Sequence, residues 1–261
     1  MNSNPVSTPV NYGEVFVVAP DAEVLGVEDK AYYQQSVGGI MYLMLSTRPD
    51  LAYSVQVLSQ HMHNPGSQHL RLLKRVFRYI KGTTALGLVY RTPDQKQHKD
   101  RLIAFSDCSF KIDAEDGMIV GGGLVILNNA ATVWMSKKQA VVATSITQGE
   151  YTQLSILTST TQYNRNLAES FGIPQYAATL LYTDSESGVF MAHNPTCASR
   201  TKHIAPKCHQ VRQQTNRGVV KPTHIPGADN VADMMTKALG PSLFRRFRDE
   251  AMGYSNIQYP V

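Results

Sequence analysis

Hydrophobic and polar positions divide the chain into a helical first part and a second part that alternates strands with helices. Residues 1–29 show no clean period and predict an irregular lead-in. Apolar residues then recur at helical spacing, so we expect helices at 32–45, 47–63 and 67–81. Thr47-Arg-Pro-Asp50 offers a hydroxyl cap, an early proline and an acid, which favours the start of a helix. A short strand is expected at 86–90.

The helix expected at 67–81 has two different faces. Its apolar face follows the i, i+3, i+4, i+7 rule and consists of Leu73, Val76, Phe77 and Ile80. Its other face is largely basic and consists of Arg71, Lys74, Arg75, Arg78 and Lys81. Two interpretations remain open for the basic face: it is solvated and keeps the helix soluble, or it contacts phosphate groups of a nucleic acid.

The pattern changes after a polar stretch that contains Pro93, and we place a domain boundary there. Strands are expected at 102–105, 120–127, 132–135, 178–183 and 219–225. Helices are expected at 145–171, from Ser185, at 205–214 and from Asn230. Pro222 predicts that the last strand lies at a sheet edge, because proline cannot donate to a strand ladder. This order predicts an α/β domain with a mixed sheet and helices on its faces.

We therefore divide the chain into four segments. They are an irregular lead-in at 1–29, a helical region at 30–91, a linker at 92–101 and the α/β domain at 102–261.

Composition narrows the class of protein further. The 43% of hydrophobic residues can supply a core, and no stretch reaches the roughly 20 apolar residues of a membrane span. Three cysteines are too few for a disulfide framework, and no signal-peptide pattern opens the chain, so we expect an intracellular protein without a membrane partner. The net charge of +5 is compatible with a polyanionic partner. Residues 187–228 contain no Asp or Glu, which predicts a positive face.

Four carboxylates stand at expected strand ends and helix starts: Asp107, Glu150, Asp184 and Asp233. Taken singly, each has a structural explanation, such as a turn residue, a helix cap or a capping box with Thr147. Taken together on one sheet edge, they would repel one another unless cations were bound. Oxygen ligands suit Mg²⁺ or Mn²⁺, and two such ions could activate a water for attack on a phosphodiester.

The chain resembles the C-terminal end of the Pol polyprotein of copia-type LTR retrotransposons over almost its whole length. In the first part the resemblance is carried by Tyr33-Gln-Gln-Ser-Val-Gly-Gly-Ile-Met-Tyr-Leu43, Thr47-Arg-Pro-Asp50 and Arg78-Tyr-Ile-Lys-Gly-Thr83. In the second part it is carried by Ser106-Asp107, Trp134-Met-Ser-Lys-Lys-Gln139, Ser145-Ile-Thr-Gln-Gly-Glu-Tyr151, Thr183-Asp184, Ser199-Arg-Thr-Lys-His-Ile204 and Ala232-Asp-Met-Met-Thr-Lys237.

The resemblance implies a fold, a site and an activity. The fold is a ribonuclease H-like mixed five-stranded sheet flanked by helices, preceded by a small helical remnant of a reverse-transcriptase thumb or connection region. The site consists of Asp107, Glu150, Asp184 and Asp233 as ligands of two Mg²⁺ or Mn²⁺ ions. The activity is cleavage of the RNA strand of an RNA/DNA hybrid. His224 falls where related enzymes carry a mobile loop histidine that aids product or metal release, although a loop histidine can simply be exposed.

Basic residues near these motifs are the expected contacts with nucleic acid. They are Lys137, Lys138, Arg200, Lys202 and His203, together with Arg71, Lys74, Arg75 and Arg78 of the basic helix face. For the two lysines, simple exposure at a strand end is an equal alternative. A zinc site from Cys197, His203, Cys208 and His209 is not expected, because the spacing matches no standard knuckle.

Departures from the family pattern keep other functions open. The usual basic and hydroxyl-rich turn reads Asp116-Gly-Met-Ile-Val-Gly-Gly122, and an expected acid is Ala205. The alternatives are a catalytically weakened nucleic-acid-binding remnant and a structural module that needs the rest of a reverse transcriptase.

No Tyr-x-Asp-Asp motif occurs, so DNA synthesis by this chain alone is not expected. Residues 4–9 resemble an internal stretch of the polyprotein, so Met1 is expected to be an internal methionine. We expect the protein in the cytoplasm, in virus-like particles or in the nucleus.

Overall fold

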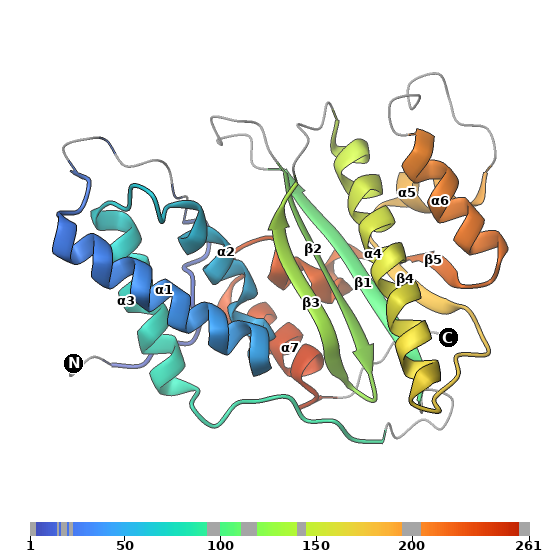
Figure 1. The fold of residues 1–261 in the computed structure, drawn as a ribbon, viewed down its shortest axis with the longest axis horizontal. Coiled ribbons are helices and arrows are strands. Elements are labelled where there is room, and N and C mark those ends of the chain that lie inside the picture. Colours follow the sequence, from blue (N-terminus) through green and yellow to red (C-terminus); the bar gives the residue numbers. More distant parts are fainter. Residues whose placement is uncertain are drawn as a thin grey trace.

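The computed structural model describes residues 4–14, 16, 20, 23–92, 100–110, 119–139, 145–194 and 205–255, with the backbone alone at 110 and 205–208. A five-stranded sheet stands between two groups of helices (Figure 1). Its strands are β1 (Leu102–Phe110), β2 (Ile119–Leu127), β3 (Ala130–Lys138), β4 (Thr179–Thr183) and β5 (Val220–His224). The spatial order is β3-β2-β1-β4-β5. The first three strands form an antiparallel meander, and β4 and β5 run parallel to β1 and to each other. The mixed five-stranded sheet is confirmed, and Pro222 lies in edge strand β5.

The meander strands are longer than the sequence predicts. β1 continues five residues beyond the expected end at Phe105, and β3 continues three beyond Met135. Both extensions pair with β2, in which Gly122 lies opposite both Asp107 and Ser136. The extensions contain polar residues, such as Asp107 and Ser136, that interrupt the hydrophobic pattern of a strand, and this explains the early ends that we predicted. Asp107 therefore lies inside β1 and not at its end.

The helices of the second part are α4 (Ile146–Ser170), α5 (Glu186–His193), α6 (Ala205–Asn216) and α7 (Pro241–Met252). Ser145 caps α4 by accepting a hydrogen bond from the amide of Gln148. Ser185, and not Asp184, caps α5 by accepting one from the amide of Gly188. We expected one helix from Asn230, but the structure has a short 3₁₀ helix there, η6 (Val231–Met235), preceded by another, η5 (Gly227–Asp229). The last α-helix, α7, begins only at Pro241.

The first part contains α1 (Val27–Thr47), η2 (Pro49–Leu51), α2 (Ala52–Gln60) and α3 (Ser67–Gly82). Thr47 is the last residue of α1 and not the expected cap of the next helix. The stretch 86–90 is extended but forms no strand, and the amide of Val89 donates to the carbonyl of Met252. The predicted strand is therefore wrong, because its backbone groups bond to the end of α7 and not to a strand.

Thr47-Arg-Pro-Asp50 has a structural role that the sequence did not reveal. Arg48 and Asp50 are 2% and 1% exposed and form a bidentate ion pair, with nitrogen to oxygen distances of 2.9 and 2.8 Å. Arg48 also donates to the carbonyl and the hydroxyl of Thr83, and the hydroxyl of Tyr79 donates to Asp50 over 2.6 Å. The ion pair thus ties η2 to the end of α3.

The first-part helices share a hydrophobic core with the sheet and with α7. This core joins Val37, Leu51 and Leu73 to Leu124 of β2 and Phe247 of α7. The indole nitrogen of Trp134 on β3 donates to the carbonyl of Met44 on α1 over 3.1 Å. A second core lies on the other face of the sheet, between the strands and α4. Among the described helices, none combines the length and the hydropathy needed to cross a bilayer.

Candidate metal centre

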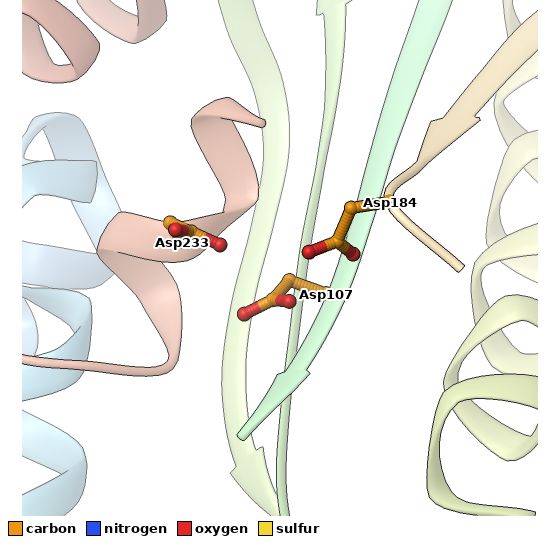
Figure 2. A group of neighbouring side chains, drawn as sticks. All are labelled: Asp107, Asp184 and Asp233. Carbon is orange, nitrogen blue, oxygen red and sulfur yellow. The ribbon is translucent and has the colours of Figure 1, made fainter. Parts of the chain in front are cut away.

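Three aspartates from three separate elements meet beside the centre of the sheet (Figure 2). Each offers one carboxylate oxygen, and the three oxygens lie within 4.8 Å of one another. Asp107 belongs to β1, Asp184 follows β4 and Asp233 belongs to η6. Ser106 and Thr183 are register partners in these parallel strands, so the two aspartates that follow them lie side by side. The third aspartate is supplied by η6, which contacts both β1 and β2.

Asn230 fixes η6 against the sheet. It is fully buried, and its side-chain oxygen accepts from the amide of Ala232 at the start of η6. Its side-chain nitrogen donates to the carbonyl of Ser106 over 3.0 Å and lies 3.4 Å from a carboxylate oxygen of Asp184. Sequence reasoning placed a helix start at this residue, and Asn230 does cap η6, but its bonds to Ser106 and Asp184 were not foreseen.

Gly122 lets η6 approach the sheet closely. A Cβ at this position would lie 2.5 Å from Cγ2 of Thr236 and 2.7 Å from Cβ of Met235. Any larger residue would therefore push against the segment that carries Asp233. Gly122 therefore makes room for the third aspartate.

A lysine stands among the aspartates. Nζ of Lys237 lies 2.9 Å from Oδ1 of Asp233 and 3.7 Å from Oδ2 of Asp107. The hydroxyl of Thr236 donates to the same oxygen of Asp107. Sequence reasoning quoted Thr236 and Lys237 in a motif but gave them no role. The four-residue spacing of Asp233 and Lys237 was the available signal for their ion pair.

Burial dominates the electrostatics of the cluster. It raises the pKa of Asp107 and raises the pKa of Asp233 to about 7. The charge of Asp184 adds to both rises, the charge of Asp107 adds to that of Asp233, and Lys237 opposes both. Burial also raises the pKa of Glu150 above its usual range. These carboxylates are therefore short of positive charge, which is the property of a site that binds cations.

Glu150 and His224 lie close to the three aspartates but are not among the residues whose carboxylate oxygens converge. Glu150 is the fifth residue of α4, and its carboxylate accepts a hydrogen bond from the hydroxyl of Ser185, the residue after Asp184. His224 was expected in a loop, but it is the exposed last residue of β5 and the register partner of Thr183.

The predicted nucleic-acid contacts fall into three groups. Arg71 and Lys74 are exposed on α3, whereas Arg75 donates to the hydroxyl of Thr8 and Arg78 to the carbonyl of Asn4, so the lead-in covers part of the basic face. Lys137 and Lys138 end β3, with Lys137 exposed and Lys138 partly buried. Arg200, Lys202 and His203 lie outside the described residues, as does most of the linker.

Sheet order and acidic cluster together define the class of protein. A three-stranded meander followed by two parallel strands, with aspartates on β1, after β4 and beside β1 on η6, is the ribonuclease H-like arrangement. Three carboxylates offer only hard oxygen donors, so the donor set fits Mg²⁺ or Mn²⁺.

Comparisons with known proteins identify the family. The chain is 35% identical over 219 residues to the Retrovirus-related Pol polyprotein from transposon RE1 of Arabidopsis thaliana, a match that covers 84% of this chain and 15% of that protein. It is 30% identical over 259 residues to the Retrovirus-related Pol polyprotein from transposon TNT 1-94 of Nicotiana tabacum, covering 98% of this chain and 19% of that protein. The chain belongs to the copia-type retrotransposon Pol family and spans less than a fifth of the length of these relatives.

Two further comparisons complete the picture. The structure of LC11-RNase H1, isolated from compost by a metagenomic approach, is similar over 52% of this chain and 93% of its own, with 16% identity and a TM-score of 0.41. No protein-family model matches the chain.

Proposed function

We propose that this chain is a metal-dependent endonuclease that cleaves the RNA strand of RNA/DNA hybrids during retrotransposon reverse transcription. The observation that carries the proposal is the convergence of Asp107, Asp184 and Asp233 within 4.8 Å. Membership of the Pol family supports the substrate, because a reverse transcriptase leaves its RNA template paired with new DNA. The same proposal assigns residues 30–91 to a thumb or connection remnant and residues 102–261 to the nuclease domain.

The aspartates have distinct positions in this proposal. Asp107 and Asp184 would hold cations at the centre of the sheet, and Asp233 and Glu150 would complete the ligand set from either side. Two bound Mg²⁺ or Mn²⁺ ions would supply an activated water and stabilise the leaving oxygen. Asn230 positions Asp184 and η6 through its hydrogen bonds, and Ser185 orients Glu150. His224 would aid product or metal release from the edge of the sheet.

Nucleic acid would be held by the exposed basic residues around this centre. Arg71 and Lys74 on α3, Lys137 and Lys138 on β3, and Arg200, Lys202 and His203 are the proposed backbone contacts. Arg75 and Arg78 can join them only if the lead-in over residues 4–8 leaves α3, since both now bond to that segment. We propose the cytoplasm, virus-like particles or the nucleus as the place of action.

A labelled RNA/DNA hybrid tests the proposal. With Mg²⁺ or Mn²⁺, the full chain should cut the RNA strand and spare the DNA strand, and Asp184→Asn should lower the rate by at least about a hundredfold because one ligand charge is lost. Asp229→Asn is the matched control, because this half-exposed aspartate pairs with Arg246 and not with the cluster. Absence of cleavage by the unaltered chain, or equal cleavage by Asp184→Asn, would contradict the proposal. Salt-dependent binding without turnover would instead favour the nucleic-acid-binding remnant.

A further inference from the structure

A cleft lies between the first-part helices and β3, on the face of the sheet that carries η6. It has a volume of about 330 Å³. This size lies at the lower end of the range for small-molecule sites. Its walls are largely apolar and come from α1, α2 and β3, with Met41, Met44, Val55 and Trp134 among them. Leu45 and Gln60 are exposed at its rim. The cleft therefore has the volume and the lining of a site for one small molecule.

Two side chains of the cleft have buried polar atoms without a hydrogen-bond partner in the described part of the chain. Gln56 is only 7% exposed, and neither its side-chain nitrogen nor its side-chain oxygen makes a hydrogen bond with any residue that the structure describes. The hydroxyl of Ser136 is also buried without a partner. Both residues line the cleft. A buried amide that makes no hydrogen bond costs free energy in the folded protein, so a ligand that supplies the missing partners would offset this cost.

The chemistry of the lining selects the class of ligand. A carboxamide offers a donor and an acceptor side by side, which is the pattern that pairs with the edge of a nucleobase. Trp134 and the methionines offer the flat and polarisable surfaces on which a base stacks. Lys138 lies two residues after Ser136 on β3, so it extends from the same face of the strand toward the rim. A cation at that place suits a phosphate group.

We propose that this cleft binds one nucleotide, with its base against Trp134, its base edge on Gln56 and Ser136, and its phosphate at Lys138. The site is separate from the carboxylate cluster and does not depend on the proposed nuclease activity. Ser136 and Asp107 both lie opposite Gly122, two strands apart, which places their Cα atoms roughly 10 Å from each other. A nucleotide held here would thus lie beside the proposed metal centre.

Trp134 is the single tryptophan of the chain, so its fluorescence reports on this cleft directly. Titration of the full chain with adenosine 5′-monophosphate should give a saturable change in emission. Ribose 5-phosphate, which has no base, should give none at the same concentrations. An oligonucleotide of six deoxyadenosines distinguishes the two sources of the nucleotide: tighter binding than the monophosphate indicates a nucleic-acid strand, and equal binding indicates a free nucleotide.

Variants separate binding from folding. Gln56→Leu should weaken binding of the monophosphate at least about tenfold, while its melting temperature stays equal or rises because an unpaired buried amide is gone. Ser136→Ala should weaken binding in the same direction. Gln213→Leu, the same substitution at an exposed position of α6 across the sheet, should change neither property.

Several results would overturn the nucleotide site. They are unchanged affinity in both Gln56→Leu and Ser136→Ala, competition of ribose 5-phosphate with the monophosphate on equal terms, and no saturable signal with either nucleotide probe. An emission change that depends on protein concentration and that nucleotide does not reverse would assign the cleft to a second copy of the chain.

Discussion

The ammonium group of Lys237 lies 2.9 Å from the carboxylate of Asp233, at the place where the cluster needs positive charge. The same ammonium lies 3.7 Å from Asp107, so one lysine partly neutralises two of the three aspartates. A divalent cation bound between these residues would compete with Lys237 for the same oxygens. The ion pair therefore links the stability of the metal-free protein to its affinity for metal.

Replacing Lys237 should change both the stability of the metal-free protein and its response to Mg²⁺. In Lys237→Met the metal-free protein should melt at a lower temperature than the unaltered chain near neutral pH, because the buried carboxylates lose their counter-charge. Added Mg²⁺ should then raise the melting temperature by more than it does in the unaltered chain. Thermal unfolding with and without Mg²⁺ measures both shifts. Lys221→Met, at an exposed position of β5, is the control, and an equal Mg²⁺ shift in Lys237→Met and the unaltered chain would contradict the prediction.

The stability of the metal-free protein should depend on pH through Asp233. Its pKa in the folded protein is raised to about 7, whereas an aspartate in an unfolded chain titrates near about 3.9. Between these values the folded state binds more protons, so the free energy of unfolding should fall as the pH rises from about 4 to about 7. Urea unfolding in the presence of a chelator measures this trend. Asp233→Asn should flatten it, and an identical pH profile for both proteins would refute the assignment.

Gly122→Ala should damage the metal centre from the strand beside Asp107. The added methyl group would meet Thr236 and Met235, whose backbone belongs to the segment that carries the third aspartate. Overpacking of this kind costs about 1–3 kcal/mol, and the displaced segment should also bind Mg²⁺ more weakly. Calorimetric titration with Mg²⁺ and chemical unfolding measure the two effects.

Gly39→Ala is the matched control for this substitution. Gly39 is exposed on α1, and a Cβ there would meet nothing within 4 Å. The change should stabilise the helix by about 0.5–1 kcal/mol and leave Mg²⁺ binding unaltered. If Gly39→Ala destabilised the protein as much as Gly122→Ala does, the close approach of η6 to Gly122 would not be the cause of the loss.

Asp50→Ala should be among the most destabilising substitutions of a buried residue in the first part of the chain. It would leave the guanidinium of Arg48 buried without its carboxylate, which costs about 3–5 kcal/mol. Asp229→Ala removes one partner of the half-exposed Asp229–Arg246 pair and should cost less than about 1 kcal/mol. Equal losses in the two variants, measured by urea unfolding, would show that burial of the Arg48 pair does not determine its contribution.

Sequence alone determined the class of the fold and the candidate ligands. Periodicity located the helices and strands of the second part, and Pro222 placed its strand at the sheet edge, because both signals are local properties of the backbone and side chains. The motifs that resemble the family singled out Asp107, Asp184 and Asp233 from the 20 acidic residues of the chain.

Tertiary structure alone decided how these residues work together. No local pattern states that Asn230 bonds to Ser106, that Lys237 also lies beside Asp107, or that Gly122 makes room for η6, because each contact joins segments about 100 residues apart or more. The same reason explains the first part. Thr47-Arg-Pro-Asp50 does lead into a helix, since η2 begins at Pro49, but the contacts of its buried ion pair with Tyr79 and Thr83 depend on the fold of the whole first part. Gln56 likewise lines a cleft only because β3 packs against α2.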